Sequence, residues 1–373
     1  MSEPSSRLLR RLNAQVVGAK DPYISDCYRA ERACFLARLG DFSGARRSIE
    51  SLRGRYSSRP DAEMSAWLNL AEGLLSHFTE LGTSAHDKVM RAHALSAATG
   101  LVRLNALSAA WLAQMDFAKL DVEKMALHVK EALRLSAPDH HSARTRACLV
   151  IAQALHLAGR WDLSSPWYTR ARLHATEEGD DLSISALMHN MVCMRLDHFR
   201  QVKLTGQGDE RGASTALTGL DSSISFDDLI GTSTLESVRP LMRARYLSLQ
   251  QRASEALLVY EEQIRKGVAS ELSRLESDVL SDIAWCRLLH GDTTGAQADA
   301  EEAERCITAR TQVDDRAATH SRLASYYRKS GDESAANRHE QLANHYWSQF
   351  NAIQERLVDL LGDMTESGEL ARS

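Results

Sequence analysis

One break of constant composition recurs along the chain and constrains its fold more than any other feature. The segments LLHGDTTGAQADAEEA (288–303) and YRKSGDESAANRHEQLA (327–343) place Gly-Asp and two alanines at the same offsets, about 40 residues apart. The glycines, Gly291 and Gly331, follow apolar-periodic runs and suit a helix that ends on a left-handed residue. The Asp that comes next suits the N-cap of a new helix. The break therefore predicts two antiparallel helices joined by a short turn.

The same break occurs at Gly40-Asp41 and, in modified form, at Gly159-Arg160. A small residue lies seven positions before each of the four glycines and another lies five positions after it. They are Ala33, Ala152, Ala284 and Ala324 before, and Ala45, Ser164, Ala296 and Ala336 after. Small side chains at these points predict that the two helices of each pair pack closely.

This pattern resembles the tetratricopeptide repeat, whose small residues hold the same positions. Ala171, Ala303 and Ala343 match its last small position, and AWLNLA (66–71) matches its W-x-x-L-[GA] core. Extending the register gives helix centres at Ala33, Ala71, Ala113, Ala152, Val192, Ala244, Ala284 and Ala324. The resemblance covers residues 22–345, although the repeats average about 40 residues where the family has about 34. It implies an all-α, right-handed α-solenoid of about eight helix pairs with a C-terminal extension helix.

Composition agrees with an all-α chain and limits the partners and cellular compartments that we expect for it. Six prolines and 6% aromatic residues favour helix over strand. The chain has 45 basic and 50 acidic residues and no dense basic run, so direct binding of nucleic acid is not expected. No long apolar run or leader peptide is visible, and the six cysteines are scattered without a C-x-x-C pair. We expect a cytoplasmic protein that does not span a membrane.

The repeat register divides the chain into five parts. They are an N-terminal capping helix (1–20), an N-terminal array (21–200), a flexible insertion (201–233), a C-terminal array (234–345) and a C-terminal helix (346–373). The insertion is rich in Gly, Ser, Thr and Asp, and its GQGDERG segment does not match a nucleotide-binding glycine loop. A short helix is expected at 210–220.

The C-terminal helix carries an apolar seam at heptad spacing. Its members are Phe350, Ile353, Leu357, Leu360 and Met364. One interpretation is a capping helix packed on the repeat at 284–345. The other is a dimerisation seam that pairs two chains or leads into an output domain.

Two short motifs resemble parts of catalytic or metal sites. His140 and His141 follow an Asp as in some phosphoesterases, and His86-Asp87 resembles a metal-binding His-Asp pair, but further ligands are not recognisable. A helix-capping turn is more typical for His140-His141. We therefore expect no catalytic residue, no metal and no cofactor.

The resemblance to tetratricopeptide repeats also implies a binding face, formed by the inner side of the first helix of each pair. Asn69 and Asn190 stand at its sixth position, where family members use an Asn to bind a ligand backbone. The other predicted inner-face residues are Gln114, Arg146, Gln153, His156, His189, Arg245, Trp285, Arg322 and Arg328. This mixture of Arg, amide and aromatic groups is typical of a peptide or small-ligand groove.

The function expected from these features is regulatory. The chain is predicted to be a non-catalytic module that binds a peptide, protein or small ligand on its concave face. It is similar to the N-terminal parts of bacterial signalling proteins such as diguanylate cyclases and transcriptional regulators. A stand-alone adaptor for protein partners is the alternative. A Rap-type peptide-pheromone receptor is a third candidate, although only about 20 residues precede the first repeat here.

Overall fold

The computed structural model describes residues 6–79, 83–206, 238–265, 276–308 and 311–366. Within these ranges the chain forms sixteen helices and no strand, which confirms the all-α prediction. The helices of the first half are α1 (Arg7–Gly18), α2 (Pro22–Leu39), α3 (Phe42–Tyr56), α4 (Ala62–Thr79), α5 (Thr83–Ala98), α6 (Val102–Phe117), α7 (Val122–Leu135), α8 (His141–Leu157), α9 (Trp161–Glu178) and α10 (Asp181–Thr205). Those of the second half are α12 (Val238–Leu249), α13 (Ala253–Arg265), α15 (Glu276–His290), α16 (Thr293–Cys306), α17 (Val313–Ser330) and α18 (Glu333–Glu366).

The predicted Gly-Asp breaks are confirmed in atomic detail. Gly40, Gly291 and Gly331 have φ angles of 88°, 95° and 92°, a backbone conformation that residues with a side chain rarely adopt. Asp41 Oδ1 then accepts a hydrogen bond from Gly44 N at 2.8 Å, and Asp292 Oδ1 accepts one from Gly295 N at 2.9 Å. Each break therefore ends one helix and caps the next, as its sequence requires.

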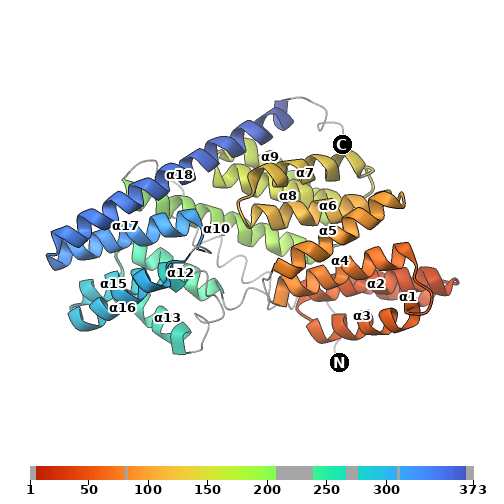
Figure 1. The fold of residues 1–373 in the computed structure, drawn as a ribbon, viewed down its shortest axis with the longest axis horizontal. Coiled ribbons are helices and arrows are strands. Elements are labelled where there is room, and N and C mark those ends of the chain that lie inside the picture. Colours follow the sequence, from red (N-terminus) through yellow and green to blue (C-terminus); the bar gives the residue numbers. More distant parts are fainter. Residues whose placement is uncertain (1–5, 80–82, 207–237, 266–275, 309–310, 367–373) are drawn as a thin grey trace.

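The predicted small residues lie where neighbouring helices meet. All eight predicted helix centres are buried, and each belongs to a different helix: α2, α4, α6, α8, α10, α12, α15 or α17. Consecutive helices pack as pairs and neighbouring pairs stack along the chain (Figure 1). The arrangement is thus a stack of helix pairs, as the repeated pattern predicts.

Helix α1 does more than cover the first helix pair. It packs on α2 and also reaches the junction between α9 and α10. Leu8 N donates to Gly179 O at 3.1 Å, and Arg7 Nη2 lies 2.8 Å from Asp181 Oδ1. The start of the chain is therefore tied to its middle.

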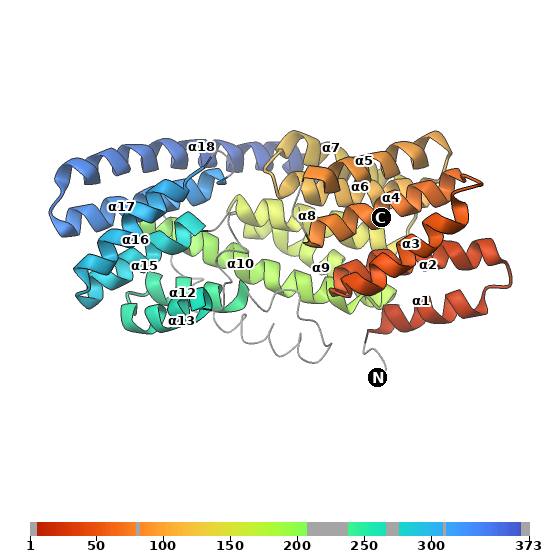
Figure 2. The same cartoon turned by 60° about the horizontal axis from the view of Figure 1, so that its bottom comes forward.

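Helix α18 returns from the C-terminal array to the N-terminal one (Figures 1 and 2). It is one 34-residue helix, so the boundary expected between residues 345 and 346 falls inside it. Its first half packs on α17, where Phe350 is buried beside Ala317 and Ala318. Its second half lies over α7 and α8.

The predicted dimer seam is part of the chain's own core. Leu357 and Met364 are buried in the same apolar cluster as α7 and α8, and Ile353 and Leu360 pack against it. Gln354 Nε2 also donates to Leu157 O, the last residue of α8, at 2.7 Å. The structure therefore shows the seam in a capping contact, but on α7 and α8 as well as on the repeat at 284–345.

Two further expectations concern the insertion and membranes. Residues 201–205 form the last turns of α10, whereas the expected helix at 210–220 and the GQGDERG segment lie outside the described residues. No helix in the described ranges combines the length and apolarity needed to cross a bilayer.

We predict that Leu357→Ala destabilises the protein by about 2–5 kcal/mol, because it leaves a cavity in a fully buried interface. Urea unfolding followed by circular dichroism measures the change. The control is Leu258→Ala on α13, whose side chain is largely exposed. Equal stability of the two variants would show that α18 does not dock on α7 and α8 in solution.

Candidate functional site

The inner face of the N-terminal array is filled by its own side chains. The predicted residues Gln114 and Arg146 do meet, with Arg146 Nη1 3.5 Å from Gln114 Oε1. The Arg146 guanidinium stacks on Trp111, 4.1 Å from the ring centroid, and burial lowers its pKa to about 9. Arg38, on α2, pairs with Asp180 at 2.9 Å beside the same ring. This part of the predicted groove is therefore closed.

The other predicted residues of this array are buried or half-buried. Gln153 is buried, and His156 Nδ1 lies 3.2 Å from the hydroxyl of Tyr168 on α9. Burial, then the charge of Arg195, lowers the pKa of His156 to about 4. Asn69 donates to Ser65 O in its own helix at 2.8 Å. His189 is buried and Asn190 is half-buried on α10.

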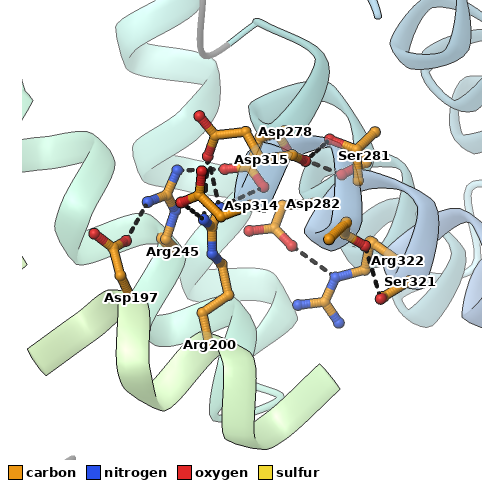
Figure 3. Close-up of polar contacts among 12 residues, drawn as sticks. Asp197, Arg200, Arg245, Asp278, Ser281, Asp282, Asp314, Asp315, Ser321 and Arg322 are labelled. Atoms are coloured by element: carbon orange, nitrogen blue, oxygen red, sulfur yellow. Dashed lines mark hydrogen bonds and ion pairs between the residues drawn. The ribbon is translucent and has the colours of Figure 1, made fainter. Parts of the chain in front are cut away.

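In the C-terminal array, the predicted residues Arg245 and Arg322 belong to a buried Arg–Asp cluster (Figure 3). Its members come from α10, α12, α15 and α17. They are Asp197, Arg200, Arg245, Asp278, Asp282, Asp314, Asp315 and Arg322. The predicted Trp285 packs beside it, with its ring centroid 5.7 Å from Arg322 Cζ.

Arg200 lies at the centre of the Arg–Asp cluster. Its guanidinium is 2.9 Å from Asp278, 3.1 Å from Asp315 and 3.4 Å from Asp314. Arg245 pairs with Asp197 and Asp278, while Arg322 Nε donates to Asp282 Oδ1 at 2.7 Å. The cluster thus links α10 to three helices of the C-terminal array.

The Arg–Asp cluster has five carboxyls for three guanidinium groups. Burial by itself would raise the pKa of Asp278. The positive charges of Arg200 and Arg245 outweigh this effect, so the pKa of Asp278 is lowered. For Asp314 the balance is reversed, because burial and the charge of Asp315 raise its pKa to about 7. The Asp314 carboxyl is therefore partly protonated near neutral pH. Most charged groups of the cluster pair with one another, although Arg200 Nε, Arg322 Nη2 and Asp314 Oδ1 are buried without a hydrogen-bond partner among the described residues.

Arg328 lies elsewhere, on the rim of a polar groove of about 790 Å³. The groove separates the ends of α8 and α10 from α17 and α18, and Arg328 pairs with Glu340 across its edge at 2.8 Å. Gln201 and Asn351 line it and bond to each other at 3.1 Å. The predicted inner-face residues thus fall into three separate places.

A second hollow, which we call the N-terminal cavity, combines rings with charged groups. Its volume is about 700 Å³, and its lining comes from α1, α2, α4 and α6 together with the start of α8 and the end of α9. Tyr28 and Trp67 supply the rings. The charged lining groups are Arg11, Glu31, Glu63, Arg103, Asp139 and Glu178.

Most of these charges have partners. Arg11 pairs with Glu178, and Arg103 lies 3.3 Å from Asp139. Glu63 accepts a hydrogen bond from the Tyr23 hydroxyl at 3.2 Å.

Glu31 is the exception, because it forms no hydrogen bond or ion pair with any residue that the structure describes. Burial, then the charge of Glu178, raises its pKa to about 7, and Arg11 and Arg103 offset only part of that rise. Among the described residues, Glu31 is therefore the lining carboxylate of the cavity that has neither a hydrogen-bond partner nor an ion-pair partner.

Sequence reasoning missed Glu31, although a signal was present. Glu31 stands two residues before Ala33, the same offset that Asn69 has from Ala71. Trp67 was recognised only as part of the repeat motif. His140, expected in a capping turn, does stand at the N-cap of α8, but its ring makes no capping hydrogen bond. It lines the cavity, and burial, followed by the charge of Arg103, lowers its pKa to about 4.

Comparison with known proteins adds no family. No protein-family model matches the chain, and no curated protein matches it. Among the described residues, no group of three or more His, Cys, Asp or Glu side chains is placed to hold a metal ion.

We predict that Asp314→Asn reduces the loss of stability as the pH rises. Between about pH 4 and pH 7 the unfolded chain has released this proton and the folded chain retains it, so the free energy of unfolding falls with rising pH. From pH 5 to pH 8 we expect this contribution to reach roughly 1–3 kcal/mol and to vanish in the variant. Urea unfolding at both pH values measures it, with exposed Asp87→Asn as the control. If the free energy of unfolding changed by the same amount from pH 5 to pH 8 in the wild type and in Asp314→Asn, Asp314 would not be the group that retains the proton.

Proposed function

We propose that this chain is a non-catalytic regulatory module and that its ligand binds in the N-terminal cavity. The observation that carries the proposal is the Glu31 carboxylate, which has no hydrogen-bond or ion-pair partner among the described residues and lines the same hollow as Tyr28 and Trp67. A cavity of about 700 Å³ lies within the usual range of small-ligand sites. A few convergent polar groups between apolar walls are typical of such sites.

The Arg–Asp cluster is a poorer candidate for the binding site. Its carboxylates and guanidinium groups already bond to one another and are almost fully buried. A ligand would have to break several of these contacts before it gained any. In the N-terminal cavity, a ligand gives Glu31 a partner without breaking a contact.

The finer assignments are part of the same proposal. The Gly-Asp breaks and buried small residues support a tetratricopeptide-like, right-handed solenoid of about eight pairs. We place the module in the cytoplasm as part of a signalling protein, with a peptide, protein or small molecule as ligand. A homodimer through Phe350, Ile353, Leu357, Leu360 and Met364 would require α18 to leave α7 and α8.

The adaptor alternative is favoured by the polar groove along α18. Its lining includes the amides of Gln201, Asn344, Asn351 and Gln354. Amide side chains can both donate to and accept from a peptide backbone. In this alternative, an extended segment of a partner protein lies in the groove.

We predict that small ligands of the module bind beside Trp67. With 5-fluorotryptophan in place of tryptophan, we expect compounds from a screen of short peptides and metabolites to shift the Trp67 fluorine resonance. Trp167 is fully buried elsewhere and serves as the internal control. The Trp67→Phe variant assigns the signal.

The result that would reject the proposal is equally defined. If no compound moves the Trp67 signal, the N-terminal cavity is not the binding site. If compounds move only the Trp347 signal, the groove beside α18 binds them and the adaptor alternative is favoured.

A further inference from the structure

We infer that the N-terminal cavity selects an organic cation, a primary ammonium or guanidinium carried on an apolar group, and that Glu31 is its counter-ion. This inference rests on the proposed function and specifies the ligand class. It follows from the charges of the cavity, the placement of its rings and the state of Glu31.

The charges of the N-terminal cavity favour a cation. Four carboxyls line it, those of Glu31, Glu63, Asp139 and Glu178, against the two guanidinium groups of Arg11 and Arg103. Both guanidinium groups are already paired, with Glu178 and Asp139. An anionic ligand would add charge to this excess, whereas a cation would compensate it.

The rings lie beside the two carboxyls that no guanidinium pairs. On α2, Tyr28 and Glu31 are three residues apart, and on the neighbouring α4, Glu63 and Trp67 are four apart. Residues at these spacings share one face of a helix, and all four line the cavity. Each helix therefore presents one carboxyl and one ring to the same space. This combination can hold a cation by an ion pair and cover its apolar carrier or its charge with a ring.

Glu31 links the binding of a cation to proton release. It is partly protonated near neutral pH in the free protein, because burial and Glu178 raise its pKa to about 7. A bound cation favours the ionised carboxylate, so the affinity rises as the pH rises from about 6 to about 8.

Other charged and titratable groups also face Glu31 in the cavity. The guanidinium groups of the lining are those of Arg11 from α1 and Arg103 from α6. His140 is uncharged because its pKa is about 4. Glu63 from α4, Glu178 from α9, and Asp139 and His141 at the start of α8 complete the titratable lining. The control for them is the variant in which only Glu31 is changed.

The same chemistry can come from a small amine or from a basic side chain of a peptide. The first arm of the test uses phenethylammonium against 2-phenylethanol and phenylacetate. The second uses the acetylated, amidated peptide Leu-Arg-Leu against Leu-citrulline-Leu. Within each arm the probes differ mainly in charge.

The test combines the Trp67 fluorine signal with calorimetric titration of the whole chain at pH 6 and pH 8. We expect at least one cation to shift Trp67 and to bind about tenfold more tightly than its neutral counterpart. Glu31→Gln should weaken this binding about tenfold and remove its pH dependence. The matched control is Glu50→Gln on the exposed face of α3, which should bind as the wild type does. Thermal unfolding shows whether each variant is folded.

The outcomes separate this inference from the proposed function. Equal or tighter binding of the neutral or anionic probes at Trp67 would overturn the cation inference and leave the cavity as the binding site. The same holds if no cation binds while other compounds of the screen shift Trp67. A silent Trp67 signal with every compound would overturn both. A cation whose affinity is the same in Glu31→Gln and in the wild type would overturn the role of Glu31.

Discussion

The ion pairs of Arg200 connect the two halves of this protein. Arg200 belongs to α10, the last helix described before the insertion, and it binds Asp315, 115 residues later, as well as Asp278. An almost fully buried guanidinium without these carboxylates would be very unfavourable, so the two arrays must stay together for the charge to be tolerated. Asp314, with its raised pKa, shows that the compensation is not complete.

In both arrays, internal contacts involve many of the side chains that were predicted to line an inner face. In the first, Arg38 of α2 reaches Asp180 at the start of α10, so the first helix pair is in contact with α10. In the second, α10, α12, α15 and α17 surround the Arg–Asp cluster. The inner face that an open solenoid would offer to a ligand is therefore replaced by internal ion pairs.

The local features of the fold were predictable from the sequence and the long-range ones were not. Gly291 and Asp292 determine a turn through their own backbone and side chain, so a few residues suffice to recognise it. The roles of Ala284 and Ala296 are equally easy to predict from the sequence, because close helix packing excludes larger side chains. The curvature of the stack depends on the small angle between each helix pair and the next, summed over many pairs. For this reason Arg146 and Gln153 were expected in an open groove and are instead buried.

The candidate site was predictable only in part, for the same reason. Glu31 occupies a position that the repeat register marks as inward-facing, so its direction follows from the sequence. Its lack of a partner depends on Arg11 and Glu178, which come from α1 and α9 and pair with each other. No local sequence pattern indicates that Arg11 pairs with Glu178 and not with Glu31. The C-terminal seam was also predictable only in part. Its heptad spacing predicts that it packs on another helix, but does not identify that helix.

The return of α18 has a consequence for the order in which the protein can be completed. An open array of helix pairs can fold from its first pair onward, since each pair needs only its neighbour. Here the apolar core of α7 and α8 includes Leu357 and Leu361, which the ribosome adds about 200 residues later. Until they arrive, that surface is exposed to water and to other chains. The last turns of α18 therefore complete a core that begins with α7 and α8.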